Sequence, residues 1–104
     1  MAQFLYVYHG GTMPETPAAG EAMMKQWTDW MGKLGAKLVT PGNPVGKSWT
    51  VDGKGAHSGG GANPTSGYSI VEAASLAEAV EMAKGCPQAA DPTGSIEVAE
   101  IMPM

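Results

Sequence analysis

Hydrophobic and polar residues alternate along the chain with two different periods, and these periods predict its secondary structure. Residues 3–9 (QFLYVYH) form a nearly continuous β-branched and aromatic run, which is typical of a central strand buried on both faces. A helix is predicted next, with Thr16 as N-cap and Pro17 as its first residue, because apolar residues recur every three or four positions up to Leu34. Gly35 suits the left-handed position that ends a helix.

The rest of the chain predicts further strands, a Gly-rich loop and a second helix. These elements are short strands at 36–40 and 47–51, a mobile loop at 55–66, a strand at 68–73, a helix after Ser75 and a strand at 95–101. Asp52-Gly53 predicts a hairpin turn. In the last strand the period of two holds through Val98 and then slips, which predicts a bulge or a frayed end.

The second helix has clear start and stop signals. Ser75 and Glu78 form a capping box, in which each side chain satisfies a backbone donor at the helix start. Gly85 ends the helix before Cys86-Pro87. The predicted buried stripe of this helix consists of Leu76, Ala79, Val80 and Ala83.

The element order is that of an α+β, ferredoxin-like βαββαβ domain covering residues 1–104. Right-handed crossovers place the first and third main strands side by side in an antiparallel four-stranded sheet, with both helices on one face. These strands carry apolar residues on both faces, so the uncovered face would be a large apolar patch in water. A second copy packing face to face would bury it, and we therefore predict a homodimer.

Composition narrows the possible partners. The net charge is −4 and the six basic residues are scattered, so nucleic acid is not an expected partner. No apolar run approaches the roughly 20 residues of a membrane-spanning helix, and no membrane association is predicted. Residues 1–9 lack the features of a signal peptide, and Cys86 is the only cysteine, which together favour a reducing cytoplasm.

Two histidines are the candidate catalytic residues. His9 ends the first strand, where a neutral imidazole could act as a general base; the alternative is a hydrogen-bonded histidine at a strand end. His57 lies in the Gly-rich loop and could swing over a ligand or remain solvated. Asp52 or Glu72 could join them on a metal, but no two potential ligands have the tight spacing of zinc sites. For that reason we predict no metal. We also predict no cofactor, and Gly10-Gly11-Thr12 lacks a full phosphate-binding fingerprint.

Four aromatic residues are candidate ligand contacts: Tyr6, Tyr8, Trp27 and Trp49. Aromatic side chains could line an apolar cavity between helix and sheet, with their polar tips orienting a ligand. The alternative is that they fill the core and the dimer interface. Cys86 has no neighbouring histidine or basic group in the sequence, so a reactive thiolate is not indicated.

The run GYSIVEAASLAEAVEMAKG at 67–85, with Cys86-Pro87 and GSIEV at 94–98, resembles the YCII-related family, which includes the DGPF proteins. The resemblance is close in this C-terminal part and extends to the N-terminal strand and helix only as a pattern. It implies a dimeric α+β barrel made from two ferredoxin-like domains. Some members are proposed to be enzymes that use a histidine on the first helix with a nearby aspartate. This first helix contains no histidine, Trp27 falls near that position, and GANP at 61–64 replaces the DGPF segment.

Three functions remain open at this stage. The chain could be a small-molecule-binding protein with an aromatic-lined cavity, in which His9 and Tyr8 make polar contacts. It could be a small enzyme that uses His9 or His57 as a general base on a small aromatic or carbonyl compound. It could also be a regulatory domain that docks on another protein. The fold alone does not choose among them.

Overall fold

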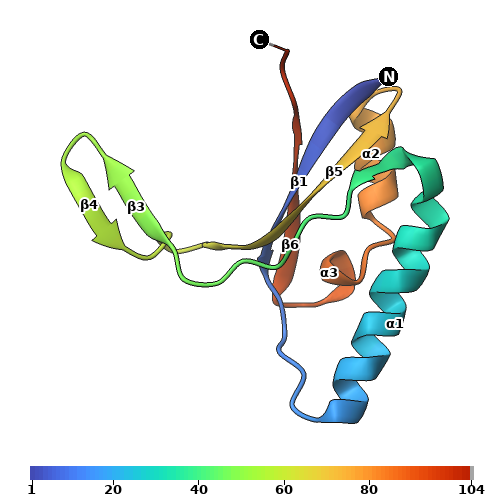
Figure 1. The fold of residues 1–104 in the computed structure, drawn as a ribbon, viewed down its shortest axis with the longest axis horizontal. Helices are drawn as coiled ribbons and strands as arrows, with labels where there is room; N and C mark the ends of the chain where they lie inside the picture. The colour runs from blue at the N-terminus through green and yellow to red at the C-terminus, as the bar shows by residue number, and fades with distance from the viewer. Residues whose placement is uncertain (104) are drawn as a thin grey trace.

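The computed structural model describes residues 1–103 and has the predicted βαββαβ order of its main elements (Figure 1). It also contains a strand at 55–58 and a short helix at 87–90 that the sequence did not predict. The strands are β1 (Ala2–Gly10), β2 (Leu38–Thr40), β3 (Trp49–Asp52), β4 (Gly55–Ser58), β5 (Thr65–Ala73) and β6 (Gly94–Glu100). The helices are α1 (Pro17–Leu34), α2 (Leu76–Ala83) and α3 (Pro87–Ala90), with one 3₁₀ turn, η1 (Gly35–Lys37).

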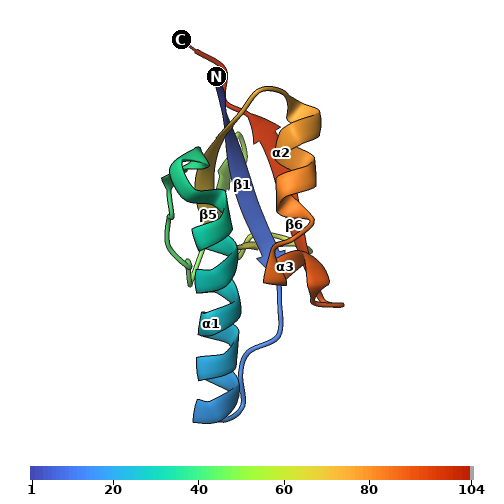
Figure 2. The same ribbon diagram turned by 90° about the vertical axis from the view of Figure 1, so that its right-hand side faces the viewer.

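The main sheet is antiparallel and its strand order is β2-β5-β1-β6. The first and third main strands, β1 and β5, therefore lie side by side as predicted, and the fold is ferredoxin-like. The helices cover one face of this sheet, and Figure 2 shows α1, α2 and α3 in front of it. No helix among residues 1–103 is long and apolar enough to span a membrane.

Strand β1 supplies three large residues to the core on the helix side of the sheet. Phe4, Tyr6 and Tyr8 are buried, and they pack with Trp30 and Leu34 of α1. The residues that alternate with them along β1 are only partly buried, because no helix covers the other face of the sheet. The central position predicted for this strand is confirmed.

Helix α1 begins and ends where the sequence predicts. The Thr16 hydroxyl accepts a hydrogen bond from the Ala19 N–H at 3.1 Å, so it satisfies one of the donors left free at the helix start. Pro17 is the first helical residue and needs no such partner. Gly35, with φ of 55°, closes the other end.

The capping box of α2 forms only in part. The Ser75 hydroxyl accepts from the Glu78 N–H at 3.2 Å, as predicted. The Glu78 carboxylate, however, accepts from the Ala74 N–H, one residue before the cap, and from the Lys37 ammonium at 3.1 Å. The hydrogen bond from Lys37, followed by that from Ala74, holds the pKa of Glu78 below its usual value.

The predicted buried stripe of α2 is half wrong. Ala79 and Ala83 are buried, whereas Leu76 and Val80 are 50% and 38% exposed. The helix thus contacts the core through its small residues. The Tyr6 hydroxyl donates a hydrogen bond to the Ala79 carbonyl, and this contact needs a close approach of helix and sheet.

Two strand predictions are also wrong. The loop expected at 55–66 is shorter, since its first four residues form β4 and its last two belong to β5. Strand β6 shows no slip, because its pairing with β1 runs in register from Gly94 to Glu100. The irregularity lies between β1 and β5, where the register shifts between Tyr8 and His9.

The hairpin of β3 and β4 forms its own two-stranded sheet. Asp52 pairs with Gly55 across a two-residue turn, and its carboxylate accepts from the Lys54 N–H at 2.8 Å, so the predicted Asp-Gly turn is confirmed. Figure 1 shows the hairpin projecting from the sheet on the side opposite the helices. We refer to residues 47–58 as the arm.

Candidate functional site

The uncovered face of the main sheet carries His9, the candidate catalytic residue of the first strand, and we refer to it as the open sheet face. Its residues alternate with the buried ones and lie on three neighbouring strands: Leu5, Val7 and His9 on β1, Tyr68, Ile70 and Glu72 on β5, and Ser95, Glu97 and Ala99 on β6. Val7 sits at the centre, with Tyr68 opposite it on one side and Glu97 on the other. The face is therefore apolar at its centre, with a titratable cluster at one end and the separate carboxylate of Glu72.

That cluster is formed by His9 and Glu97. The His9 Nε2 atom lies 3.1 Å from Glu97 Oε1, and His9 Nδ1 lies 3.3 Å from the carbonyl oxygen of Pro64. The His9 side chain is only 12% exposed, whereas that of Glu97 is 68% exposed. When both ring nitrogens carry a proton, Nδ1–H donates to Pro64 and Nε2–H donates to Glu97. The imidazole is thus fixed in orientation, and its carboxylate partner is free to move.

The backbone that carries His9 is held by contacts at the end of β1. The Gln88 side-chain amide donates to the carbonyl oxygens of His9, at 2.8 Å, and Gly10, at 3.1 Å. Gly10 has φ of 66°, and a Cβ atom there would lie 2.1 Å from the Thr93 carbonyl oxygen. The close approach therefore requires glycine at this position.

Asp91 ties the same end of the sheet together. Its carboxylate accepts from the N–H groups of Thr12, at 2.7 Å, and Thr93, at 2.8 Å, and from both threonine hydroxyls. These hydrogen bonds, led by the one from the Thr93 N–H, lower the pKa of Asp91 to about 2. Asp91 therefore acts as a structural anion and not as a proton donor near neutral pH.

Three of the predicted aromatic ligand contacts lie on the helix side of the sheet. The Tyr6 hydroxyl donates to Ala79, the Tyr8 hydroxyl donates to Ser69 Oγ at 2.8 Å, and Trp27 packs edge-on against Tyr8 with ring centroids 5.1 Å apart. Burial, followed by the nearby Cys86, raises the pKa of Tyr6 to about 12. These rings pack with one another, on the face opposite His9.

The other two predicted site residues lie on the arm. Trp49 is 67% exposed on β3, and His57 is exposed on β4, paired with Thr50. Neither is in hydrogen-bonding contact with His9, whose ring partners are Pro64 and Glu97. In the described part of the chain, no three His, Cys, Asp or Glu side chains gather closely enough to hold a metal ion.

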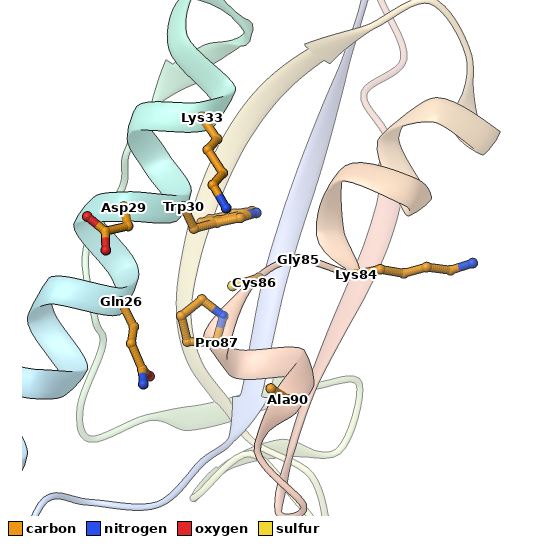
Figure 3. Close-up of a pocket in the computed structure, with 9 residues that line it drawn as sticks. All are labelled: Gln26, Asp29, Trp30, Lys33, Lys84, Gly85, Cys86, Pro87 and Ala90. Carbon is orange, nitrogen blue, oxygen red and sulfur yellow. The ribbon is translucent and has the colours of Figure 1, made fainter.

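The helix side carries a shallow hollow of about 330 Å³ between α1 and α3 (Figure 3). It is lined by Gln26, Asp29, Trp30, Lys33, Lys84, Gly85, Cys86, Pro87 and Ala90. Burial raises the pKa of the Cys86 thiol to about 11, so the thiol stays protonated and unreactive. The Trp30 indole N–H is bonded to the Met82 carbonyl at 3.0 Å. This hollow therefore offers no catalytic group comparable to His9.

Sequence reasoning selects His9 as a candidate but does not identify the groups that hold its side chain. Glu97 alternates with Ile96 and Val98, which was sufficient to place it on the opposite face of β6 from them. Its position beside His9, however, depends on the register between β1 and β6, which the sequence does not specify. Pro64 contributes only its backbone carbonyl, and no residue-type signal marks such a group.

The chain was compared with known protein families, curated proteins and solved structures. A family model described as the YCII-related domain matches residues 4–104. No curated protein matches the sequence. Among solved structures, the chain is similar to 5-chloro-2-hydroxyhydroquinone dehydrochlorinase (TftG) from Burkholderia phenoliruptrix AC1100, in complex with 2,5-dihydroxybenzoquinone. The TM-score is 0.55 and the identity 18%, over 94% of this chain and 93% of that chain, and a likeness at this identity shows the fold alone.

Proposed function

The chain belongs to the YCII-related family, and from this premise we propose that it binds a small molecule on its open sheet face, at His9 and Glu97. The observation that carries the proposal is the nearly enclosed imidazole of His9, held between the Pro64 carbonyl and the exposed carboxylate of Glu97. The structurally similar dehydrochlorinase is described in complex with a quinone, which supports a ligand of this size on this fold.

The ligand that suits these residues is a small flat ring carrying a hydroxyl or carbonyl oxygen. Its oxygen accepts a hydrogen bond from His9 Nε2–H in place of the exposed Glu97 carboxylate. Its ring packs on Val7 and against Tyr68, which lie beside His9 on the open sheet face. The acidic side chain of Glu97 then turns to solvent, at little cost because it is already exposed.

A second copy of the chain covers the ligand and makes the protein a homodimer. Leu5, Val7 and Ile70 lie together on the open sheet face, and in a single chain they face water. Sheets pack face to face about 10 Å apart, and the side chains of the two faces share the space between them. In this proposal, the ring takes up part of that space beside His9. The dimer thus excludes water from His9 and strengthens its hydrogen bonds.

The same geometry favours one alternative, a small enzyme that uses His9 as a general base on an aromatic or carbonyl compound. The Pro64 carbonyl fixes the proton of a neutral imidazole on Nδ1, which leaves the lone pair on Nε2. Nε2 is the atom that faces Glu97, and a carboxylate there stabilises the imidazolium that forms when His9 accepts a proton.

Binding is tested by thermal shift and calorimetry with 2,5-dihydroxybenzoquinone and a series of hydroxybenzoates as probes. A probe that binds the native chain raises its melting temperature. We expect His9→Ala to weaken binding at least about tenfold, because the ligand oxygen loses its hydrogen-bond partner, and an unpaired buried acceptor costs about 1–3 kcal/mol. Equal affinity in wild type and His9→Ala, or no shift with any probe, contradicts the proposal.

His57→Ala is the matched control, since it removes the other histidine from an exposed position on the arm. We expect its affinity for the probe to stay within about twofold of wild type, within the usual effect of surface substitutions. Spectrophotometry of the probe with wild-type protein separates the two functions. Binding without turnover supports the binding protein, and turnover lost in His9→Ala supports the enzyme.

A further inference from the structure

We propose that the arm, residues 47–58, is an exchange element: in a pair of subunits, each arm packs its apolar face, Trp49 and Val51, on the other subunit. The inference rests on the proposed function, because it takes the open sheet face as the surface that a second copy covers. It goes further by assigning part of that interface to a segment that belongs to neither the sheet nor the helices.

The arm has one apolar face and one polar face. Trp49 and Val51 alternate with Thr50 along β3, so they point to the same side, and they are 67% and 76% exposed. Across the hairpin, Trp49 pairs with Ser58 and Val51 with Ala56. The polar side carries Thr50 opposite His57. An isolated two-stranded hairpin is at best marginally stable in water, so an arm of this composition requires a surface to pack on.

A single chain exposes more surface than a compact monomer of its mass. The excess is larger than the area that one partner buries in an interface of standard size. The chain exposes 7015 Å², whereas a compact monomer of its 10.7 kDa mass exposes about 5,500 Å². The excess of about 1,500 Å² is above the roughly 800 Å² that each partner buries in an interface of standard size. The radius of gyration, 14.8 Å against about 13 Å for this length, reflects the same extension.

The charges of the arm and of the open sheet face are complementary, which favours a second copy as the partner of the arm. The arm carries Lys47 and Lys54 against Asp52, a net charge of +1 in a chain whose net charge is −4. The rest of the chain is therefore at −5, and its open sheet face contributes Glu72 and Glu97. A basic arm is attracted to an acidic face that is also apolar at its centre.

The place where the arm leaves the sheet directs it away from its own chain. Figure 1 shows the arm departing at the end where β1 stops and β5 begins, and extending outward from the open side. Gly67, near the start of β5, pairs with Pro44, so the root of the arm is fixed to the main sheet. A two-fold axis then lets two arms and two open faces bury one another at once, because both surfaces are present on every copy.

The test measures the dimer dissociation constant by sedimentation velocity for four proteins: wild type, Trp49→Ser/Val51→Ser, His57→Ser and Val7→Arg. The arm variant changes only exposed side chains, so each subunit keeps its fold, which circular dichroism and urea unfolding check. We expect the arm variant to raise the dissociation constant at least about a hundredfold, since a buried tryptophan is a typical interface hot spot. His57→Ser changes the polar face of the same arm and should stay within about threefold of wild type.

Val7→Arg separates this inference from the proposed function. It places a charge at the centre of the open sheet face, so it abolishes the dimer if the sheets pack face to face. If Val7→Arg disrupts the dimer and the arm variant does not, the arm inference is overturned and the sheet-face dimer stands. A wild-type chain that is monomeric at every concentration overturns both.

Tryptophan fluorescence provides a second measurement on the arm itself. Trp27 and Trp30 belong to the core of a single chain, so the difference between wild type and Trp49→Phe isolates Trp49. We expect this difference emission to shift to the blue, and its quenching by acrylamide to fall, as the protein concentration rises through the dissociation constant. Emission that stays solvent-like in the dimer overturns the inference.

Discussion

His9 and Glu97 are 88 positions apart in the sequence, yet His9 Nε2 and Glu97 Oε1 lie 3.1 Å apart on the open sheet face. The register of β1 and β6 brings them together: Val7 is directly opposite Glu97, and His9 is the next residue of β1 on the same face. One partner is nearly enclosed and the other is exposed. A pair built in this way is expected to matter for binding more than for stability.

We therefore expect Glu97→Gln to leave the free energy of unfolding within about 0.5 kcal/mol of wild type, because the Glu97 carboxylate is largely exposed and water screens its interactions. Urea unfolding followed by circular dichroism measures this. The same variant should raise the affinity for the quinone probe. The neutral amide competes with the probe oxygen for His9 Nε2–H less well than a carboxylate does. A loss of stability well above that range, with unchanged probe affinity, would assign the pair a structural role.

Gly10→Ala and Gly32→Ala are the same substitution with opposite expected effects. At Gly10 the backbone has φ of 66° and a Cβ atom would meet the Thr93 carbonyl oxygen, so we expect a loss of at least about 2 kcal/mol. At Gly32, inside α1, nothing lies within 4 Å of the added Cβ, and alanine should stabilise the helix by about 0.5–1 kcal/mol. Urea midpoints of the two variants compare them directly, and equal signs would contradict the local geometry.

The sequence predicts those parts of the fold that depend on local rules. Helix α1 starts at Thr16 and Pro17 and ends at Gly35, and the contacts that cap it involve only neighbouring residues. The sequence does not predict the features of the fold that depend on tertiary contacts. Residues 55–58 (GAHS) stand at the start of a stretch rich in Gly, Asn and Ser, yet they form β4 because β3 offers a pairing partner across the Asp-Gly turn. Leu76 and Val80 fit a helical stripe, but Tyr6 reaches Ala79 and fixes which side of α2 faces the sheet.

In the candidate site, too, local rules predict one part and tertiary contacts determine the rest. His9 is a polar residue at the end of an apolar strand, and that pattern alone marks it. The aromatic residues Tyr6 and Tyr8 carry the same residue-type signal for a ligand cavity as for a core, and their side of the sheet is known only once α1 and α2 are placed. Glu97 requires the register of two strands that lie at opposite ends of the chain.

Alkaline pH should destabilise the protein in a defined window. Burial raises the pKa of Cys86 from 9.0 to about 11 and that of Tyr6 from 10.0 to about 12. A raised pKa in the folded state means that the unfolded chain releases its proton first as the pH rises. The stabilising contribution is therefore complete below pH 9 and is lost between about pH 9 and pH 12.

Urea unfolding at a series of pH values from 8 to about 11 measures this dependence. The control is Tyr6→Phe/Cys86→Ala, which removes these two groups and leaves Tyr8, whose pKa is also raised by burial. This variant starts from a lower stability, because it loses a buried hydroxyl contact and creates a small void. Its slope with pH should nevertheless be flatter than that of wild type. Identical slopes would mean that these two groups do not titrate differently in the folded and unfolded states.

Acid should also destabilise the protein, through Asp91. Four hydrogen bonds from Thr12 and Thr93 lower its pKa from 3.8 to about 2, so the folded state holds the charged form more strongly than the unfolded chain does. The resulting stability is present above about pH 3.8 and is lost as the pH falls toward 2. Asp91→Asn should lower stability at neutral pH and flatten this acid limb, because an amide has one acceptor oxygen where the carboxylate has two. Asp29→Asn, on the exposed surface of α1, is the control and should leave both features as in wild type. If Asp91→Asn leaves the acid limb as steep as wild type, the loss of stability in acid originates at another carboxylate.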